Sequence, residues 1–529
     1  MRNYLYQLIG GPVPQSEPIT GREPEMVRNS NGGYVFPVDD WTRLERFLIL
    51  GAEGGSFYAG ERPLALENAQ AVKRAIVEDG LRAVRLIVKI SEAGRAPKND
   101  PALFALAMAA AYGDERTRRA AFRALPVVAR TGTHLFRFAA FAGSMRGWGR
   151  GLRNAIAGWY LAGDTAGLAY QAVKYRQRDG WSHRDLLRLS HPKTEGARNA
   201  LFGWVAQGTI ESGLWPELAV VEGFEQARVA DSERAVAALV RKFGLTREML
   251  PTEFLDSREV WLALFERMPL GALVRNLATL TRVGVLAPLS DETARVVERL
   301  GDAQALRQAR LHPVAILAAL LTYKAGRGAR GRHEWTPVPA IVDALDAAFE
   351  RAFETVEASG RRFYLGLDVS GSMSWGEVSG VPGLTPRVAA AAMAMVIART
   401  EPRYHVAAFA HRMTELEVAA SDSLADVCRK TDALPFGATD CALPMLDALE
   451  RKLAVDCFVV LTDSETWFGD VHPAEALKRY RAETGIAAKL VVVGMISNGF
   501  SIADPQDAGM LDVVGFDTAA PSLITDFAR

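Results

Sequence analysis

The sequence predicts a multidomain α and α/β protein, in which an array of helices precedes an open, mostly parallel α/β domain. Three observations support this prediction: the chain has 529 residues, helical hydrophobic patterns continue to about residue 359, and short β-rich runs alternate with helices from Arg361. A chain of this length exceeds the usual domain size several times over. We therefore expect at least two hydrophobic cores.

Residues 1–38 form the first element, which we expect to be an extended arm without regular structure. Glycines and prolines crowd the stretch from Gly10 to Pro37, and these residues interrupt helices and strands. The first residues lack the apolar core of a signal peptide, and no apolar run approaches the roughly 18 residues that span a bilayer. We expect a cytoplasmic protein.

Residues 39–360 form the helical element. The spacing of its apolar residues matches one face of successive helices, and short turns with proline separate them. Loose helical hairpins of this kind indicate an α-solenoid related to HEAT repeats, whereas a compact irregular helical domain is the alternative. The clearest helix has a capping box at Asp256 and Glu259 and then the stripe Trp261, Leu264, Phe265 and Met268.

Residues 361–529 form the α/β element. Alternating strands and helices predict βαβ units around a parallel sheet covered by helices on both faces. Ligands of such sheets bind beyond the carboxyl ends of the strands. The expected strands are 363–369, 405–409, 457–462 and 489–495, and the expected helices are about 386–400, 440–452 and 473–484.

Five oxygen-bearing residues of this element form a candidate metal site. Asp368, Ser370 and Ser372 follow one predicted strand, Asp463 follows another, and Thr439 lies in a turn that leads into a helix. Carboxylate and hydroxyl oxygens with water suit a hard divalent cation, most simply Mg²⁺. The pattern resembles the metal-ion-dependent adhesion site of von Willebrand factor A domains. The alternative is that these residues only cap helices.

Three enzyme signatures are absent from the same stretch. A nucleophile elbow needs glycine two residues before the serine, where Ser370 has Asp368 and Ser372 has Ser370. No second aspartate stands two residues after Asp368, as an aspartyl-phosphate enzyme requires, and no GK[ST] run forms a phosphate-binding loop. The site therefore favours binding over catalysis.

Basic and acidic side chains are distributed unevenly between the two parts of the chain. Residues 361–529 carry 15 basic and 22 acidic side chains, and subtraction from totals of 62 and 62 leaves 47 basic and 40 acidic in residues 1–360. Within that first part, residues 116–198 hold 16 Lys or Arg against 4 Asp or Glu. A surface with this excess attracts polyanions.

Aromatic residues are interleaved with these cations. Arginine pairs with phosphates and stacks on bases, and aromatic rings stack on bases of any sequence, so the mixture suits RNA or single strands. A solvated basic face over an aromatic core is the alternative. The segment includes Arg137, Trp148, Arg150, Lys174, Tyr175, Arg178, Trp181, His183, Arg184, Arg188 and His191.

Three long motifs give the chain a family resemblance. The run KYRQRDGWSHRDLLRLSH (174–191), the run NGGYVFPVDDWTRLERFLILGAEGG (31–55) and the run SNGFSIADPQDAGMLDVVGFD (497–517) resemble the Ro autoantigen (TROVE domain) family, particularly its bacterial members. The resemblance covers nearly the whole chain. It implies a ring of HEAT-like repeats closed beside a von Willebrand factor A domain.

The resemblance also implies the ligands. Members of the family bind Y RNA on the outer surface and single-stranded ends of misfolded or immature RNA in the central hole. By motif, Lys174, Arg178 and His191 match positions that contact Y RNA, with Arg184 and Arg188 as supports. To these we add His183, Arg137 and Arg150 from the basic segment. The stretch 134–150 is shorter and poorer in lysine than in animal members, so affinity for misfolded RNA is expected to differ.

We expect a noncatalytic, monomeric RNA-binding protein, the core of a small ribonucleoprotein in RNA quality control, processing or decay. It would present RNA ends to exoribonucleases and bind an acidic protein ligand at its metal site. The alternative is a metal-dependent protein–protein adaptor whose helical array is only a scaffold. A nuclease is disfavoured because one ion held by hydroxyls lacks a positioned general base.

Overall fold

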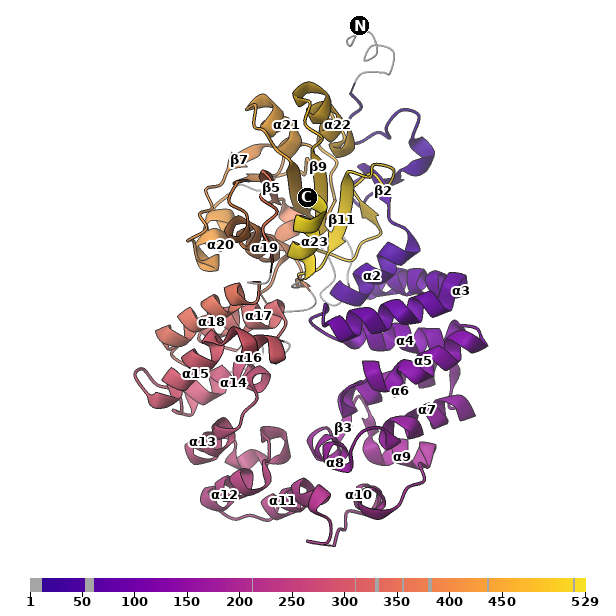
Figure 1. Cartoon of the computed structure of the whole chain (residues 1–529), viewed down its shortest axis with the longest axis vertical. Helices are drawn as coiled ribbons and strands as arrows, with labels where there is room; N and C mark the ends of the chain where they lie inside the picture. The colour runs from indigo at the N-terminus through magenta and orange to yellow at the C-terminus, as the bar shows by residue number, and fades with distance from the viewer. Residues whose placement is uncertain are drawn as a thin grey trace.

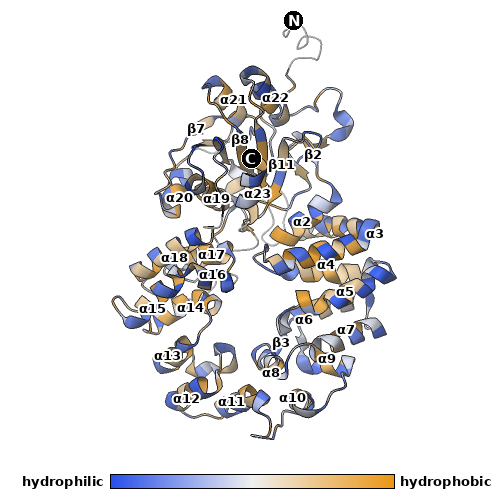
Figure 2. Cartoon of the chain, viewed as in Figure 1, coloured by the Kyte–Doolittle hydropathy of each residue, from blue (hydrophilic) through white to orange (hydrophobic). Residues whose placement is uncertain are grey.

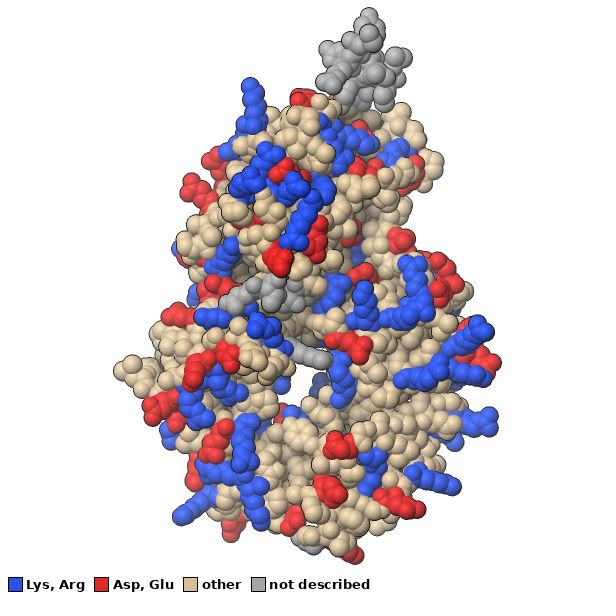
Figure 3. Space-filling model, viewed as in Figure 1, with Lys and Arg blue, Asp and Glu red and all other residues tan. Residues whose placement is uncertain are grey.

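The structure is a computed structural model, and it describes residues 12–52, 61–211, 213–309, 311–328, 333–353, 356–378, 383–434, 437–516 and 519–529. Helices form two limbs of an arch, and the α/β domain joins the two upper ends (Figure 1). Figure 3 shows an opening through the molecule between the limbs. The predicted ring of helical repeats beside an α/β domain is confirmed.

Nine helices form the first limb, within the part of the chain that the structure describes. Helix α4 is the most buried of them, because it packs against α2, α3, α5 and α6, and Figure 2 shows it as largely apolar. The helices are α2 (Asp40–Leu50), α3 (Glu61–Ala93), α4 (Asp100–Tyr112), α5 (Glu115–Val128), α6 (Gly132–Arg146), α7 (Arg150–Leu161), α8 (Thr165–Lys174), α9 (His183–Ser190) and α10 (Gly196–Gln207).

The second limb returns to the α/β domain. The predicted stripe lies on α13, where Trp261, Leu264 and Phe265 are buried. The predicted capping box is wrong, because Ser257 accepts the hydrogen bond from the Val260 amide and Asp256 instead pairs with Arg282. The helices are α11 (Ala219–Ala227), α12 (Glu233–Phe243), α13 (Arg258–Glu266), α14 (Leu270–Arg282), α15 (Asp291–Gly301), α16 (Ala303–Gln308), α17 (Pro313–Lys324) and α18 (Pro339–Arg351).

The α/β domain contains a six-stranded sheet in the order β11-β9-β8-β5-β6-β7, parallel except for β7. The four predicted strands are confirmed, and the short β7 and β11 were not predicted. The strands are β5 (Phe363–Asp368), β6 (Tyr404–Phe409), β7 (Met413–Glu415), β8 (Cys457–Thr462), β9 (Lys489–Gly494) and β11 (Met510–Val514).

Helices cover both faces of this sheet. Residues of α21 and α22 form one core with the N-terminal arm, whereas residues of α19, α20 and α23 belong to a core that continues into the helical arch. The three predicted helices are confirmed, and α20 and α23 were not predicted. The helices are α19 (Pro386–Thr400), α20 (Leu424–Asp432), α21 (Leu443–Glu450), α22 (Pro473–Thr484) and α23 (Ala519–Ala528).

The N-terminal arm is not simply extended. Its described part, from residue 12, contains β1 (Val27–Arg28) and β2 (Tyr34–Pro37), and β2 pairs with β10 (Phe500–Ser501) of the α/β domain. The expected lack of regular structure is therefore wrong, because the strand partner lies far away in the sequence. Among the described residues, no helix is long and apolar enough to cross a membrane.

Both limbs contact the α/β domain. On the α18 side, the Phe349 ring stacks on Phe516 with centroids 6.0 Å apart, and Arg399 pairs with Glu350. On the α2 side, the guanidinium of Arg46, only 1% exposed, pairs with Asp512 of β11 at 2.5 Å. Arg46 also donates to the carbonyl oxygens of Asn498 and Phe500.

We expect Arg46→Ala to destabilise the junction between α2 and the α/β domain strongly. Removing one partner of a buried ion pair leaves the other charge uncompensated and costs about 3–5 kcal/mol. Thermal unfolding and limited proteolysis should show a lower midpoint and earlier cleavage. Arg74→Ala, which breaks an exposed pair with Asp40, should cost less than about 1 kcal/mol. Equal losses of stability in the two variants would contradict the structural role that we assign to Arg46.

Candidate metal centre and nucleic-acid interface

The five predicted metal ligands lie on loops at one edge of the sheet. Asp368 ends β5, Asp463 follows β8 directly, and these strands are parallel neighbours with Leu367 opposite Leu461. The carboxyl ends of parallel strands meet at one edge, which brings the two carboxylates together. All five residues are buried.

Hydrogen bonds fix the side chains of four of the predicted ligands. The Ser370 amide donates to Asp368 Oδ1 at 2.8 Å, and the Ser370 and Ser372 hydroxyl oxygens lie 3.1 Å apart. Ser372 also hydrogen-bonds the Asp463 side chain. Thr462, which was not predicted, donates to Asp368 Oδ2 at 2.6 Å. The loop after β5 and the loop after β8 are therefore connected by hydrogen bonds.

Thr439 is held on the same loops through its backbone. Its carbonyl oxygen accepts from the amides of Trp467 and Phe468 at 3.0 and 3.1 Å, and these residues continue the loop that begins at Asp463. The structure places Thr439 beside the loop of Asp463. That its hydroxyl binds a metal stays a prediction.

The electrostatics of the cluster fit a hard cation. Burial, and then the neighbouring Asp368 carboxylate, raise the pKa of Asp463 to about 8. Burial also raises the pKa of Asp368. Two buried carboxylates with neutral hydroxyls beside them offer hard oxygen ligands and a negative charge that a divalent cation would offset. A cation at this point would supply an electrophilic position for an acidic ligand.

The N-terminal arm packs directly on the metal loop, which sequence reasoning missed. The Ser30 amide donates to Glu465 Oε2 at 2.9 Å, and Asn29 Nδ2 donates to the Thr466 carbonyl at 2.6 Å. Gly33 is required here, because a Cβ atom would clash with the Thr466 carbonyl. The Asp-x-Glu spacing of Asp463 and Glu465 was the one local signal for a further carboxylate.

Large aromatic side chains surround the metal loops at the surface. Trp375 follows the short 3-10 helix Gly371–Ser374 and is 51% exposed, while Trp467 and Phe468 are 37% and 48% exposed. Exposed aromatic residues are enriched where proteins bind one another. This edge of the sheet therefore combines the candidate cation site with an aromatic rim.

The candidate RNA-binding residues lie mostly on one continuous segment, the α8–α9 segment (residues 165–191). Helix α8 ends at Lys174, a hairpin of β3 (Gln177–Arg178) and β4 (Trp181–Ser182) follows, and α9 comes next. Asp179 and Gly180 both have positive φ angles of 52° and 78°, which a two-residue hairpin turn requires. Ser182 and Asp185 form a capping box that starts α9.

Most of the predicted cations of this segment reach solvent. Arg184 and Arg188 are exposed on one face of α9, opposite the buried Leu186 and Leu187, and the exposed His191 follows directly after the helix. Arg178 is exposed on β3, and Arg150 is exposed at the start of α7. Lys174 is half-buried, and its Nζ donates to the Tyr170 hydroxyl at 3.0 Å.

Two candidates need correction or revision. His183 is only 2% exposed and shares a 2.7 Å hydrogen bond with the Tyr160 hydroxyl, so it belongs to the core beneath α9 and does not face a ligand. Arg137 is three-quarters buried, and its guanidinium pairs with Asp100 and Asp179. Arg137 thus holds the hairpin turn, and its charge is already engaged.

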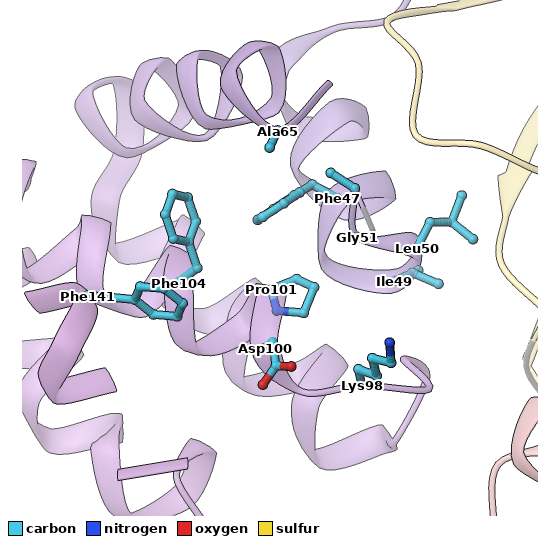
Figure 4. A pocket seen from close by; sticks show the side chains of 11 residues that line it. Phe47, Ile49, Leu50, Gly51, Ala65, Lys98, Asp100, Pro101, Phe104 and Phe141 are labelled. Atoms are coloured by element: carbon cyan, nitrogen blue, oxygen red, sulfur yellow. The ribbon is translucent and has the colours of Figure 1, made fainter. Parts of the chain in front are cut away.

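An apolar pocket of about 170 Å³ lies where α2, α4 and α6 meet (Figure 4). Phe47, Phe104 and Phe141 line it in successive edge-to-face contacts, with Asp100 and Lys98 at one side. Its lining identifies no ligand by charge or hydrogen bonding. We assign it no function.

Comparison with known proteins identifies the family. Residues 27–211 and 219–322 match the family model of the TROVE domain, and residues 362–528 match that of the Ro60 vWA domain. The chain belongs to the Ro60 family. Both halves of the chain, and therefore the helical ring and the α/β domain, match domains of this family.

Full-length relatives agree with this assignment. The chain is 45% identical to the RNA-binding protein RO60 of Deinococcus radiodurans, covering 100% of this chain and 99% of that protein. It is 36% identical to the RNA-binding protein RO60 of Caenorhabditis elegans, covering 95% and 90%. The crystal structure of the Deinococcus radiodurans RO (RSR) protein is similar with a TM-score of 0.73 at 46% identity, covering 93% of this chain and 99% of that one.

Acid should destabilise this Ro60 family member through His183. Burial lowers the pKa of His183 to about 4, from an ordinary value of 6.5. As the pH falls, the unfolded chain therefore binds a proton first, and stability is lost progressively between about pH 6.5 and pH 4. Thermal unfolding of His183→Gln should depend less on pH over this window. His333→Gln, at an exposed histidine, should follow the wild type, and identical pH profiles for all three proteins would contradict this prediction.

Proposed function

We propose that this chain is a noncatalytic RNA-binding protein, the core of a small ribonucleoprotein. The observation that carries the proposal is the row of exposed arginines on the α8–α9 segment, Arg178, Arg184 and Arg188, with His191 beside them. This row adjoins the half-buried Lys174. Phosphate contacts of this kind supply most of the affinity of such proteins for nucleic acid. The names of its relatives, which are RNA-binding proteins, support the same function.

The ligands would differ between the outer surface and the opening. A folded noncoding RNA such as a Y RNA would bind the α8–α9 segment, and a single-stranded end of a misfolded or immature RNA would enter the opening between the limbs. The protein would act as a cytoplasmic monomer and present these ends to exoribonucleases for processing or decay.

Lys174→Ala with Arg178→Ala should weaken binding of a labelled RNA hairpin that carries a single-stranded tail by about tenfold at moderate salt. Fluorescence anisotropy across salt concentrations should show a shallower dependence of affinity on salt. Lys478→Ala with Arg479→Ala, an exposed pair on α22, provides a control of equal charge and should bind like the wild type. Loss of affinity in the control alone, or no RNA binding by the wild type, would refute the proposal.

We further propose that Asp368, Ser370, Ser372, Thr439 and Asp463 hold one Mg²⁺ ion to which an acidic protein ligand binds. The aromatic rim of Trp375, Trp467 and Phe468 supports a protein partner, because exposed aromatic side chains anchor protein interfaces. The acidic balance of residues 361–529 makes this domain a poor RNA surface. In this respect the molecule is a metal-dependent adaptor as well as an RNA-binding protein.

Millimolar Mg²⁺ should raise the midpoint of thermal unfolding by several degrees, because an ion bound only by the folded state stabilises it. Asp463→Asn should abolish this response, and without Mg²⁺ it should unfold no earlier than the wild type, since it removes the repulsion with Asp368. Asp526→Asn, at an exposed aspartate, is the control and should keep the response. An undiminished response in Asp463→Asn would place the ion elsewhere.

A further inference from the structure

A second group of cations, from the opposite limb, meets Lys174 at a pocket. Lys174 at the end of α8 lines this cavity of about 70 Å³ together with residues of α12, α13 and α14 and of the loops between them. The pocket includes Arg241, Arg247 and Arg267, which lie outside the basic segment 116–198. Residues more than sixty positions apart in the sequence thus share one cavity.

The pocket carries a net positive charge. Four cations line it, Lys174, Arg241, Arg247 and Arg267, against the two carboxylates Glu248 and Glu266. Glu266 pairs with Arg241 at 2.8 Å, and Arg247 donates to the neutral Asn276 side chain at 2.9 Å. Arg267 is exposed, and its side chain forms no hydrogen bond or ion pair with the described residues. The charges of Arg247 and Arg267 are therefore not balanced by carboxylates of the pocket wall.

The backbone adds to this preference for an anion. Helix α14 begins at the pocket, because Met268, Pro269 and Ala272 belong to the lining. The helix has no side-chain N-cap and no acidic residue in its first turn. The amino-terminal end of a helix carries a partial positive charge that favours phosphate. On the other side, Lys174 sits over the rings of Tyr170 and Tyr175, at 5.2 and 5.4 Å, which orients its ammonium group.

We propose that this pocket binds a backbone phosphate of the same RNA that contacts the α8–α9 segment, so that the RNA bridges the two limbs of the ring. The inference rests on the proposed RNA-binding function. Lys174 belongs to both surfaces, which makes the pocket continuous with the row of cations on β3 and α9. Arg247 and Arg267 supply planar guanidinium groups suited to phosphate oxygens.

Affinity and salt dependence test the proposal in the full-length protein. With a labelled RNA hairpin that carries a single-stranded tail, Arg247→Ala and Arg267→Ala should each weaken binding about fivefold. Removal of the phosphate contact should lower the slope of log Kd against log salt by about one. Arg234→Ala, at an exposed arginine at the other end of α12 and outside the pocket, is the matched control and should change neither quantity. Arg267→Gln keeps a polar side chain with part of the aliphatic stem but removes the charge, and it should weaken binding as much as Arg267→Ala if the charge is responsible.

A double-mutant cycle tests whether one phosphate is shared. If Lys174 and Arg267 hold the same group, their combined loss will be smaller than the product of the two single losses. Two results would overturn the proposal that the pocket binds phosphate while leaving the effect of Lys174→Ala intact. One is that the affinity losses of the two single variants multiply in the double variant. The other is that the binding curves of Arg247→Ala and Arg267→Ala coincide with that of Arg234→Ala. Failure of the wild type to bind any RNA would instead overturn the proposed function itself.

Discussion

The ring depends on the buried guanidinium of Arg46. A helical arch has two free ends, and each end exposes apolar helix surface unless another element covers it. Arg46 connects the first end to Asp512 and to the carbonyl oxygens of the loop at residues 498–500. Burial of an arginine without its carboxylate and carbonyl partners would be strongly unfavourable. The helical arch and the α/β domain are therefore constrained to the one relative position in which Arg46 meets these partners. At the other end, the stacked rings of Phe349 and Phe516 and the ion pair of Arg399 with Glu350 join α18 to the α/β domain.

The loop that Arg46 holds also contacts the candidate metal site. Asn498, which accepts from Arg46, donates its side-chain amide to the Asp463 carbonyl at 2.6 Å. From the other side, the N-terminal arm bonds the next residues of the same loop through Ser30 and Asn29. The metal loop is thus supported by the helical arch and by the arm together. An ion or a partner that stabilises this loop will therefore also stabilise the junction on which ring closure depends.

Local sequence predicted those features whose causes are local. The strands ending at Asp368 and Thr462 are short apolar runs, and their carboxyl ends converge in a parallel sheet, so the proximity of Asp368 and Asp463 followed from pattern alone. The pairing of β2 with β10 and the contact of Ser30 with Glu465 join residues more than 400 positions apart, and no local pattern encodes them. His183 was placed wrongly for the same reason. Its neighbours Arg184 and Arg188 are exposed, and only the position of Tyr160 shows that His183 faces inward.

The division of charge between the two units fits the two functions that we propose for them. A site that holds a hard cation needs carboxylates and a negative surround, which repels phosphate, whereas an RNA surface needs unpaired cations, which would repel Mg²⁺. In this chain the conflict is resolved by distance: the metal loops and the α8–α9 segment lie on different units, and the arch separates them (Figure 1). A phosphate bound at the Lys174 pocket would contact side chains of both limbs. This contact would lie far from the α/β domain, against which both limbs also pack. The two limbs would then be held together at two places. The contacts with the α/β domain are largely buried, and their Arg46–Asp512 pair is therefore screened little by salt, whereas the phosphate contact would be weakened by salt.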